Sequence, residues 1–171
     1  MSRESVLWCV LALSLMPRLS MGSDERDPWP VYPDHPPSMD YVALEVEGER
    51  LNGLIYRAGG PGPHPGVVLL HGYPGNEKNL DLAQSLRRAG FNVLFFHYRG
   101  AWGSDGDFRL LNAVEDVAAA GERMRTDPDM NTDPERVSVV GHSMGGFLTL
   151  QHAGRDPDLR CAVPLAFANM G

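Results

Sequence analysis

The chain has 171 residues, of which 43% are hydrophobic and 22% are charged, and its formal net charge is −7. This length and composition fit one globular domain with a sizeable core. The acidic balance and the lack of any Lys/Arg run argue against nucleic acid as a partner.

Residues 1–22 are expected to form a signal peptide. Arg3 precedes an apolar stretch, Val6–Met16, and small residues follow it. The stretch has the length of a signal-peptide core and is too short to span a bilayer. We therefore expect a secreted or periplasmic protein with no stable membrane anchor. The alternative is that translation starts at Met21, which would leave a cytoplasmic protein.

Residues 23–40 are rich in proline, which predicts an extended lead-in. The domain is expected to occupy residues 41–171 and to open with a β-hairpin. Tyr41–Val46 alternates between apolar and polar residues, Glu47–Glu49 is typical of a turn, and Leu51–Tyr56 resumes the apolar pattern.

From Gly66 onward, short apolar runs alternate with amphipathic segments. The runs predict strands buried on both faces. Such alternation indicates the α/β class, with a mostly parallel sheet, flanking helices and functional residues at the carboxyl ends of the strands. The expected elements are strand 67–70, helix 80–89, strand 93–96, helix 110–125, strand 137–140, helix 144–154 and strand 160–167. The residues expected on the inner face of helix 110–125 are Val114, Val117, Ala118, Gly121 and Met124.

The strongest local motif is Gly141-His-Ser-Met-Gly145, which lies between a predicted strand and a predicted helix. It matches the nucleophile-elbow pattern G-x-S-x-G. A strand that turns sharply into a helix holds the serine in a strained conformation, and small neighbours relieve the crowding. The pattern favours Ser143 as a catalytic nucleophile. The alternative is a glycine-rich turn with an incidental serine.

A second motif, "LLHGYPG" at residues 69–75, follows an earlier predicted strand, and "HYRG" follows the next one. Together with "VVGHSMGG", these motifs resemble the α/β-hydrolase superfamily in order and spacing. The resemblance covers residues 41–171 and implies the first six strands of that fold. It also implies a serine hydrolase that cleaves an ester or an amide/peptide bond through an acyl-enzyme.

In that family two backbone N–H groups form the oxyanion hole, and they correspond here to Met144 and Tyr73. Members similar to prolyl oligopeptidase use a tyrosine hydroxyl at a similar place, so the Tyr73 hydroxyl is an open alternative. His71 resembles the family's loop-ordering histidine. His97 departs from the aspartate that many members carry before Arg-Gly, and we expect it to be a supporting residue. Arg99 and Asp105 either order the loop over the site or are solvated.

The family's acid and histidine follow the nucleophile in the chain. After Ser143 the sequence offers His152, Asp156 and Asp158. At about 100° and about 1.5 Å per helical residue, His152 should lie on the opposite face and about 13 Å further along. The two aspartates are expected to be surface charges, and an upstream base such as His97 would be unusual. We therefore expect an incomplete triad in a chain truncated at its C-terminal side.

The sequence predicts a serine hydrolase for a small-molecule ester or peptide, with neither a cofactor nor a metal. The alternative is a non-catalytic, hydrolase-like remnant that binds a partner or ligand. A dinucleotide-binding domain is disfavoured because no G-x-G-x-x-G follows a predicted strand.

Overall fold

The computed structural model describes residues 32–167. The expected signal peptide lies outside the described residues, and that interpretation stays a prediction. Within residues 32–167, no helix combines the length and the apolar character that crossing a bilayer requires.

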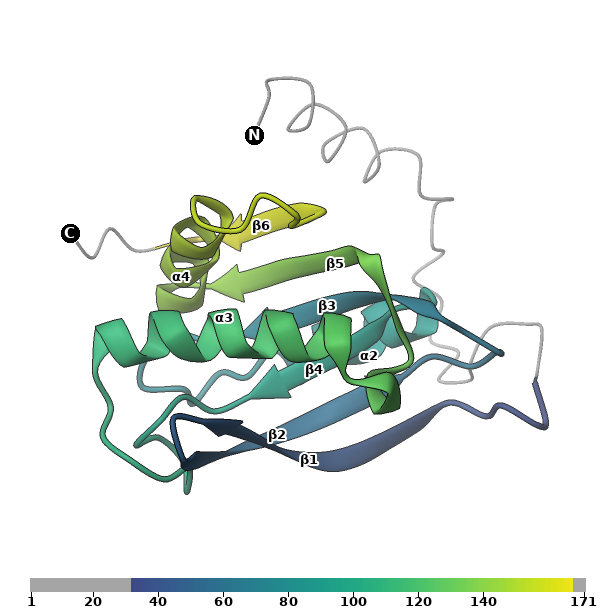
Figure 1. Ribbon diagram of the computed structural model, residues 1–171, viewed down its shortest axis with the longest axis horizontal. Helices are drawn as coiled ribbons and strands as arrows, with labels where there is room; N and C mark the ends of the chain where they lie inside the picture. The colour runs from purple at the N-terminus through teal and green to yellow at the C-terminus, as the bar shows by residue number, and fades with distance from the viewer. Residues whose placement is uncertain (1–31, 168–171) are drawn as a thin grey trace.

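The described chain forms one six-stranded sheet in the order β1-β2-β4-β3-β5-β6 (Figure 1). β1 and β2 are antiparallel to each other, and β2 is antiparallel to β4, whereas β3, β4, β5 and β6 run parallel. The prediction of a mostly parallel sheet preceded by a hairpin is confirmed. The strands are β1 Ser38–Val46, β2 Glu49–Arg57, β3 His64–Leu70, β4 Asn92–Phe96, β5 Thr132–His142 and β6 Cys161–Leu165.

The hairpin closes through a two-residue turn. Val46 pairs with Glu49, so Glu47 and Gly48 are the turn residues, and their φ angles are 53° and 85°. Positive φ at both central positions is the geometry whose twist matches that of paired strands. β1 begins at Ser38, so the hairpin already includes the last residues of the expected lead-in.

Helices cover both faces of the sheet. α3 (Leu110–Thr126) and α4 (Met144–Ala153) pack on one face, and α2 (Leu80–Arg88) packs on the other (Figure 1). A short 3-10 helix, Pro128–Met130, leads from α3 into β5. β5 therefore begins at Thr132, earlier than the strand that was expected from residue 137.

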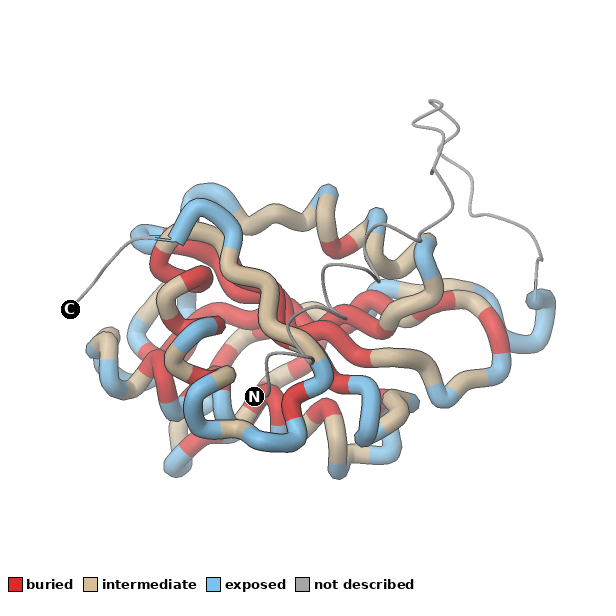
Figure 2. The backbone as a smooth tube through the Cα atoms, turned by 90° about the horizontal axis from the view of Figure 1, so that it is seen from above, coloured by how far each residue is buried: buried red, intermediate tan, exposed pale blue. Residues whose placement is uncertain are grey.

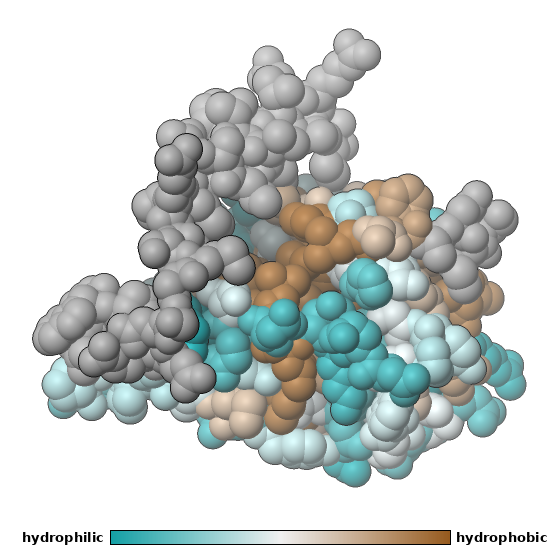
Figure 3. Space-filling model, turned by 180° about the vertical axis from the view of Figure 1, so that it is seen from behind, coloured by the Kyte–Doolittle hydropathy of each residue, from teal (hydrophilic) through white to brown (hydrophobic). Residues whose placement is uncertain are grey.

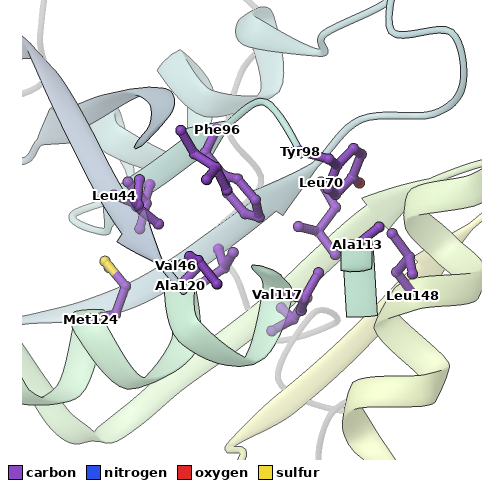
Figure 4. Close-up of a cluster of buried hydrophobic side chains, with 14 of the residues drawn as sticks. Leu44, Val46, Leu70, Phe96, Tyr98, Ala113, Val117, Ala120, Met124 and Leu148 are labelled. Carbon is purple, nitrogen blue, oxygen red and sulfur yellow. The ribbon is translucent and has the colours of Figure 1, made fainter. Parts of the chain in front are cut away.

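Two hydrophobic clusters, one on each face, hold these layers together. Burial concentrates along the middle of the molecule, where the strands run (Figure 2). In the larger cluster, Ala113, Val117 and Ala120 of α3 face Leu70 and Phe96 of the sheet (Figure 4). On the α2 face, hydrophobic side chains remain partly uncovered, and they form the brown area seen from behind (Figure 3).

The inner face of α3 differs in one respect from the expected one. Ala118 is exposed, whereas Ala113, Asp116 and Ala120 are fully buried. The helix is therefore rotated so that a carboxylate points into the protein. That carboxylate pairs with Arg99, which follows β4.

Candidate active site

Ser143 occupies a strained turn between β5 and α4. Its φ and ψ angles are 57° and −118°, outside the regions that residues with a side chain favour. A Cβ atom on Gly141 would lie 2.2 Å from the carbonyl oxygen of Gly145, and one on Gly145 would lie 2.5 Å from that of Leu70. The glycines of the motif are thus needed for close backbone packing, as the sequence predicted.

The elbow is held in place by the strand beside it. The Ser143 N–H donates to the carbonyl oxygen of Leu165 in β6 at 3.0 Å, and the Ser143 carbonyl accepts from the Phe147 N–H at 3.2 Å. Both backbone groups of the serine are therefore engaged. Its hydroxyl makes no hydrogen bond with any residue in the range 32–167.

The loop after β3 lies against this serine because of strand register. Leu70 pairs with Gly141 in the β3–β5 ladder, so extending the register by two residues brings Gly72 beside Ser143. A Cβ atom on Gly72 would be 3.0 Å from the Ser143 Cβ and 3.4 Å from its Oγ. The structure therefore brings the two predicted motifs together.

The two N–H groups expected to form an oxyanion hole have no acceptor in the described part of the chain. Met144 is the first residue of α4, where helical N–H groups lack intrahelical partners. Tyr73 lies in the loop beyond Gly72, and its N–H is likewise unpaired among residues 32–167. The Tyr73 side chain is 65% exposed and its ring packs on Phe108 at 5.0 Å.

Two buried histidines lie behind this loop. His71 Nδ1 is 2.6 Å from the carbonyl oxygen of Gly72, and His71 Nε2 is 3.2 Å from His97 Nδ1. Burial lowers the pKa of His71, and burial together with the neighbouring His71 and Lys78 lowers the pKa of His97 to about 4. Both imidazoles are therefore neutral at pH 7. His97 contacts His71 behind the loop, and its expected supporting role stays a prediction.

Arg99 is buried, so it is not a solvated residue. It donates to Asp116 at 2.6 Å, and it also pairs with Glu47 of the hairpin turn and Glu115 of α3, each at 2.6 Å. Burial raises the pKa of Asp116 although the hydrogen bonds from Arg99 oppose this shift. Arg99 thus orders the loop after β4. The Asp105 side chain is exposed, and only its backbone holds the loop. Its carbonyl accepts from the Gly100 N–H, and its N–H donates to the Arg50 carbonyl.

His152 lies near the C-terminal end of α4, as the helical spacing predicted, and its side chain is buried. Its Nε2 lies 3.1 Å from Asp156 Oδ2, and Arg125 donates to the same oxygen at 2.6 Å. The expectation that Asp156 is a surface charge is wrong, because its side chain is 12% exposed within this cluster, whereas Asp158 is exposed as expected.

No described histidine interacts with the Ser143 hydroxyl. All six histidines of the sequence fall within residues 32–167. Four of them are His64, bonded to Gly60, the pair His71 and His97, and His152 beside Asp156. Among the described residues, no group of three His, Cys, Asp or Glu side chains is placed to hold a metal ion.

Comparison with known proteins agrees with this geometry. A profile described as "Alpha/beta hydrolase family" matches residues 67–168. The chain belongs to the α/β-hydrolase family. The matched range includes the loop after β3 and the elbow at Ser143.

Several relatives give the resemblance more detail. An uncharacterized protein of Mycobacterium tuberculosis is 28% identical over 79% of this chain and 48% of its own length. Cutinase 2 of Thermobifida cellulosilytica is 32% identical over 66% of this chain and 43% of its own length. The structure of Est1E from Butyrivibrio proteoclasticus, with ferulic acid bound, has a TM-score of 0.67 at 23% identity and covers 75% of this chain and 53% of that one. The chain thus spans about half the length of these relatives.

Proposed function

We propose that Ser143 is the nucleophile of a serine hydrolase that cleaves carboxylic ester or amide bonds. The observation that carries the proposal is the position of Ser143. The serine lies on a strained elbow against Gly72, beside two N–H groups, those of Tyr73 and Met144, that have no acceptor among residues 32–167. Strain at a single residue that the surrounding backbone enforces is typical of a functional position.

In the proposed reaction, Ser143 Oγ attacks the carbonyl carbon and its proton passes to a general base. The carbonyl oxygen becomes an oxyanion, which the N–H groups of Tyr73 and Met144 bind. Each such donor is worth about 3–4 kcal/mol in the transition state. Collapse of the tetrahedral intermediate releases the alcohol or amine, which takes up a proton, and leaves an acyl-enzyme that water hydrolyses.

The general base and its acid are assigned to residues outside the range 32–167. Within that range, His71, His97 and His152 are engaged elsewhere, and Ser143 Oγ has no hydrogen-bond partner. The proposed role of this part of the chain is therefore to supply the nucleophile and the oxyanion hole. The similarity to Cutinase 2 supports an ester rather than an amide as the substrate.

The test is the hydrolysis of p-nitrophenyl butyrate by the full-length gene product, with and without Ser143→Ala. We expect a Ser143-dependent rate at least about 1000-fold above that of the variant, because removal of one triad member reduces kcat by about 10⁴–10⁶. Equal rates for the two proteins would overturn the proposal. The isolated 171-residue chain, measured in parallel, should show little Ser143-dependent turnover.

Tyr73→Phe separates the two ways in which Tyr73 can act. The substitution removes the hydroxyl and keeps the N–H. A loss of about 100-fold or more in kcat would assign oxyanion binding to the hydroxyl, as one donor is worth 10²–10³. A smaller change would assign it to the backbone.

A second candidate function is binding without turnover. This alternative is supported by the absence, within residues 32–167, of a base that is hydrogen-bonded to the Ser143 hydroxyl. Here the full-length protein would show no Ser143-dependent hydrolysis, and it would still bind a butyrate ester with the same affinity before and after Ser143→Ala.

A further inference from the structure

His97 follows β4 directly, and its backbone is fixed on both sides. Its N–H donates to the carbonyl oxygen of Asn52 at 2.8 Å, and its carbonyl accepts from the Ser104 hydroxyl at 2.9 Å. That hydroxyl also accepts from the Asn52 N–H at 3.0 Å. The residue is 8% exposed. Its imidazole therefore has a defined position and little access to water.

Strand register brings this imidazole beside His71. Leu69 pairs with Phe95 in the β3–β4 ladder, so two residues further on His71 lies next to His97. The ring centroids are 5.1 Å apart, and His97 Nδ1 is 3.2 Å from His71 Nε2. The contact thus follows from the sheet and does not depend on a mobile loop.

The hydrogen-bond partners determine where the protons are. His71 Nδ1 is 2.6 Å from the Gly72 carbonyl oxygen, which can only accept, so Nδ1 carries a proton. In a neutral imidazole the other nitrogen, His71 Nε2, is then an acceptor. His97 Nδ1 must therefore donate to it. The two rings form a directed relay from His97 to His71 to the carbonyl of Gly72.

This relay ends on the peptide group that matters for catalysis. The Gly72 carbonyl and the Tyr73 N–H belong to the same peptide, and the N–H is the proposed oxyanion donor. A hydrogen bond to the oxygen fixes the peptide plane and polarises the N–H at its other end. On the far side of Tyr73, the Trp102 Nε1–H donates to the Pro74 carbonyl at 2.7 Å. The Trp102 ring also stacks on His97, with centroids 6.0 Å apart.

We propose that His97 is a positioning residue of the oxyanion hole, which acts through His71 to hold the Gly72–Tyr73 peptide beside Ser143. The proposal rests on the proposed function of Ser143 for its catalytic consequence, and on the hydrogen-bond geometry alone for its structural part. The low pKa values of both rings agree with it, since each stays neutral at pH 7.

The structural part is tested by ¹⁵N NMR of the imidazoles in the full-length protein at pH 7. We expect both His71 and His97 to be neutral with the proton on Nδ1. His71 protonated on Nε2, or charged, would overturn the relay whether or not the protein has activity. This measurement needs no substitution, so it does not depend on a variant that folds.

The catalytic part is tested with His97→Phe and His97→Asn on p-nitrophenyl butyrate. Phenylalanine keeps a ring against Trp102 but has no donor, whereas the asparagine amide can place an N–H where Nδ1 lies. We expect kcat to fall about tenfold in His97→Phe with KM nearly unchanged, and His97→Asn to recover most of that loss. The Tyr73 amide resonance should shift in His97→Phe and return toward its original position in His97→Asn.

A control lies at the opposite end of β3, where His64 bonds to Gly60. His64→Phe should leave kcat unchanged. If His97→Phe and His97→Asn lose activity equally, or neither loses any, His97 only fills space and the proposal is wrong. If wild type and Ser143→Ala turn over equally, the proposed function fails, and the NMR result still decides the relay.

Discussion

Gly72 and Ser143 touch: a Cβ atom on Gly72 would lie 3.0 Å from the Ser143 Cβ. This distance is at the lower limit of real contacts between side-chain carbons, so the loop after β3 and the elbow after β5 have no room between them. The contact sets the distance between Ser143, the proposed nucleophile, and the peptide of Tyr73. Both segments continue paired strands, so the sheet itself determines this spacing.

Gly72→Ala should therefore damage the site more than the fold. The added methyl group pushes the loop away from Ser143 by a few tenths of an ångström, and we expect kcat/KM to fall about tenfold because small displacements of catalytic groups are costly. The free energy of unfolding should change by less than about 1 kcal/mol. Gly154→Ala is the matched control, since its nearest neighbour is 3.7 Å away. Equal activity of both variants would contradict the argument.

Ser143→Gly should be more stable than Ser143→Ala. A φ of 57° with a ψ of −118° is strained for any residue with a Cβ atom and is open to glycine. We expect glycine to raise the free energy of unfolding by about 1 kcal/mol relative to alanine. At most other positions glycine is the destabilising choice. Urea denaturation of the two variants measures the difference, and a more stable alanine variant would show that the elbow is not strained.

Part of this arrangement was predictable from the sequence because it follows from local patterns. Apolar runs predicted the parallel strands, and glycines around Ser143 predicted the elbow. The burial of Asp116 was not predictable, because it depends on Arg99, which is brought to α3 only by the fold. The burial of Asp156 was not predictable for the same reason, since Asp156 follows α4 and its partner Arg125 comes from α3. The His71–His97 contact depends on the register between β3 and β4, which no local pattern contains.

Asp116→Ala should be strongly destabilising. The carboxylate is fully buried and accepts from both the backbone N–H and the side chain of Arg99, so its removal leaves a guanidinium with a buried unpaired N–H. Removing one partner of such a pair typically costs about 3–5 kcal/mol. Asp40→Ala, which breaks the exposed pair with Arg57, should cost less than about 1 kcal/mol. If urea denaturation gives the same midpoint for both variants, the buried Arg99–Asp116 pair does not stabilise the fold as argued.

The stability of the protein should depend on pH through His97. Burial first, and the neighbouring His71 and Lys78 next, lower the pKa of His97 in the folded protein from 6.5 to about 4. As the pH falls below 6.5, the unfolded chain takes up a proton that the folded protein cannot, so the free energy of unfolding decreases until about pH 4. Between pH 7.5 and 5, the wild type should lose about 2 kcal/mol more than His97→Asn, which does not titrate at this position. Urea titrations of both proteins at the two pH values measure this difference. An equal loss in both would mean that His97 is protonated as readily in the folded protein as in the unfolded chain.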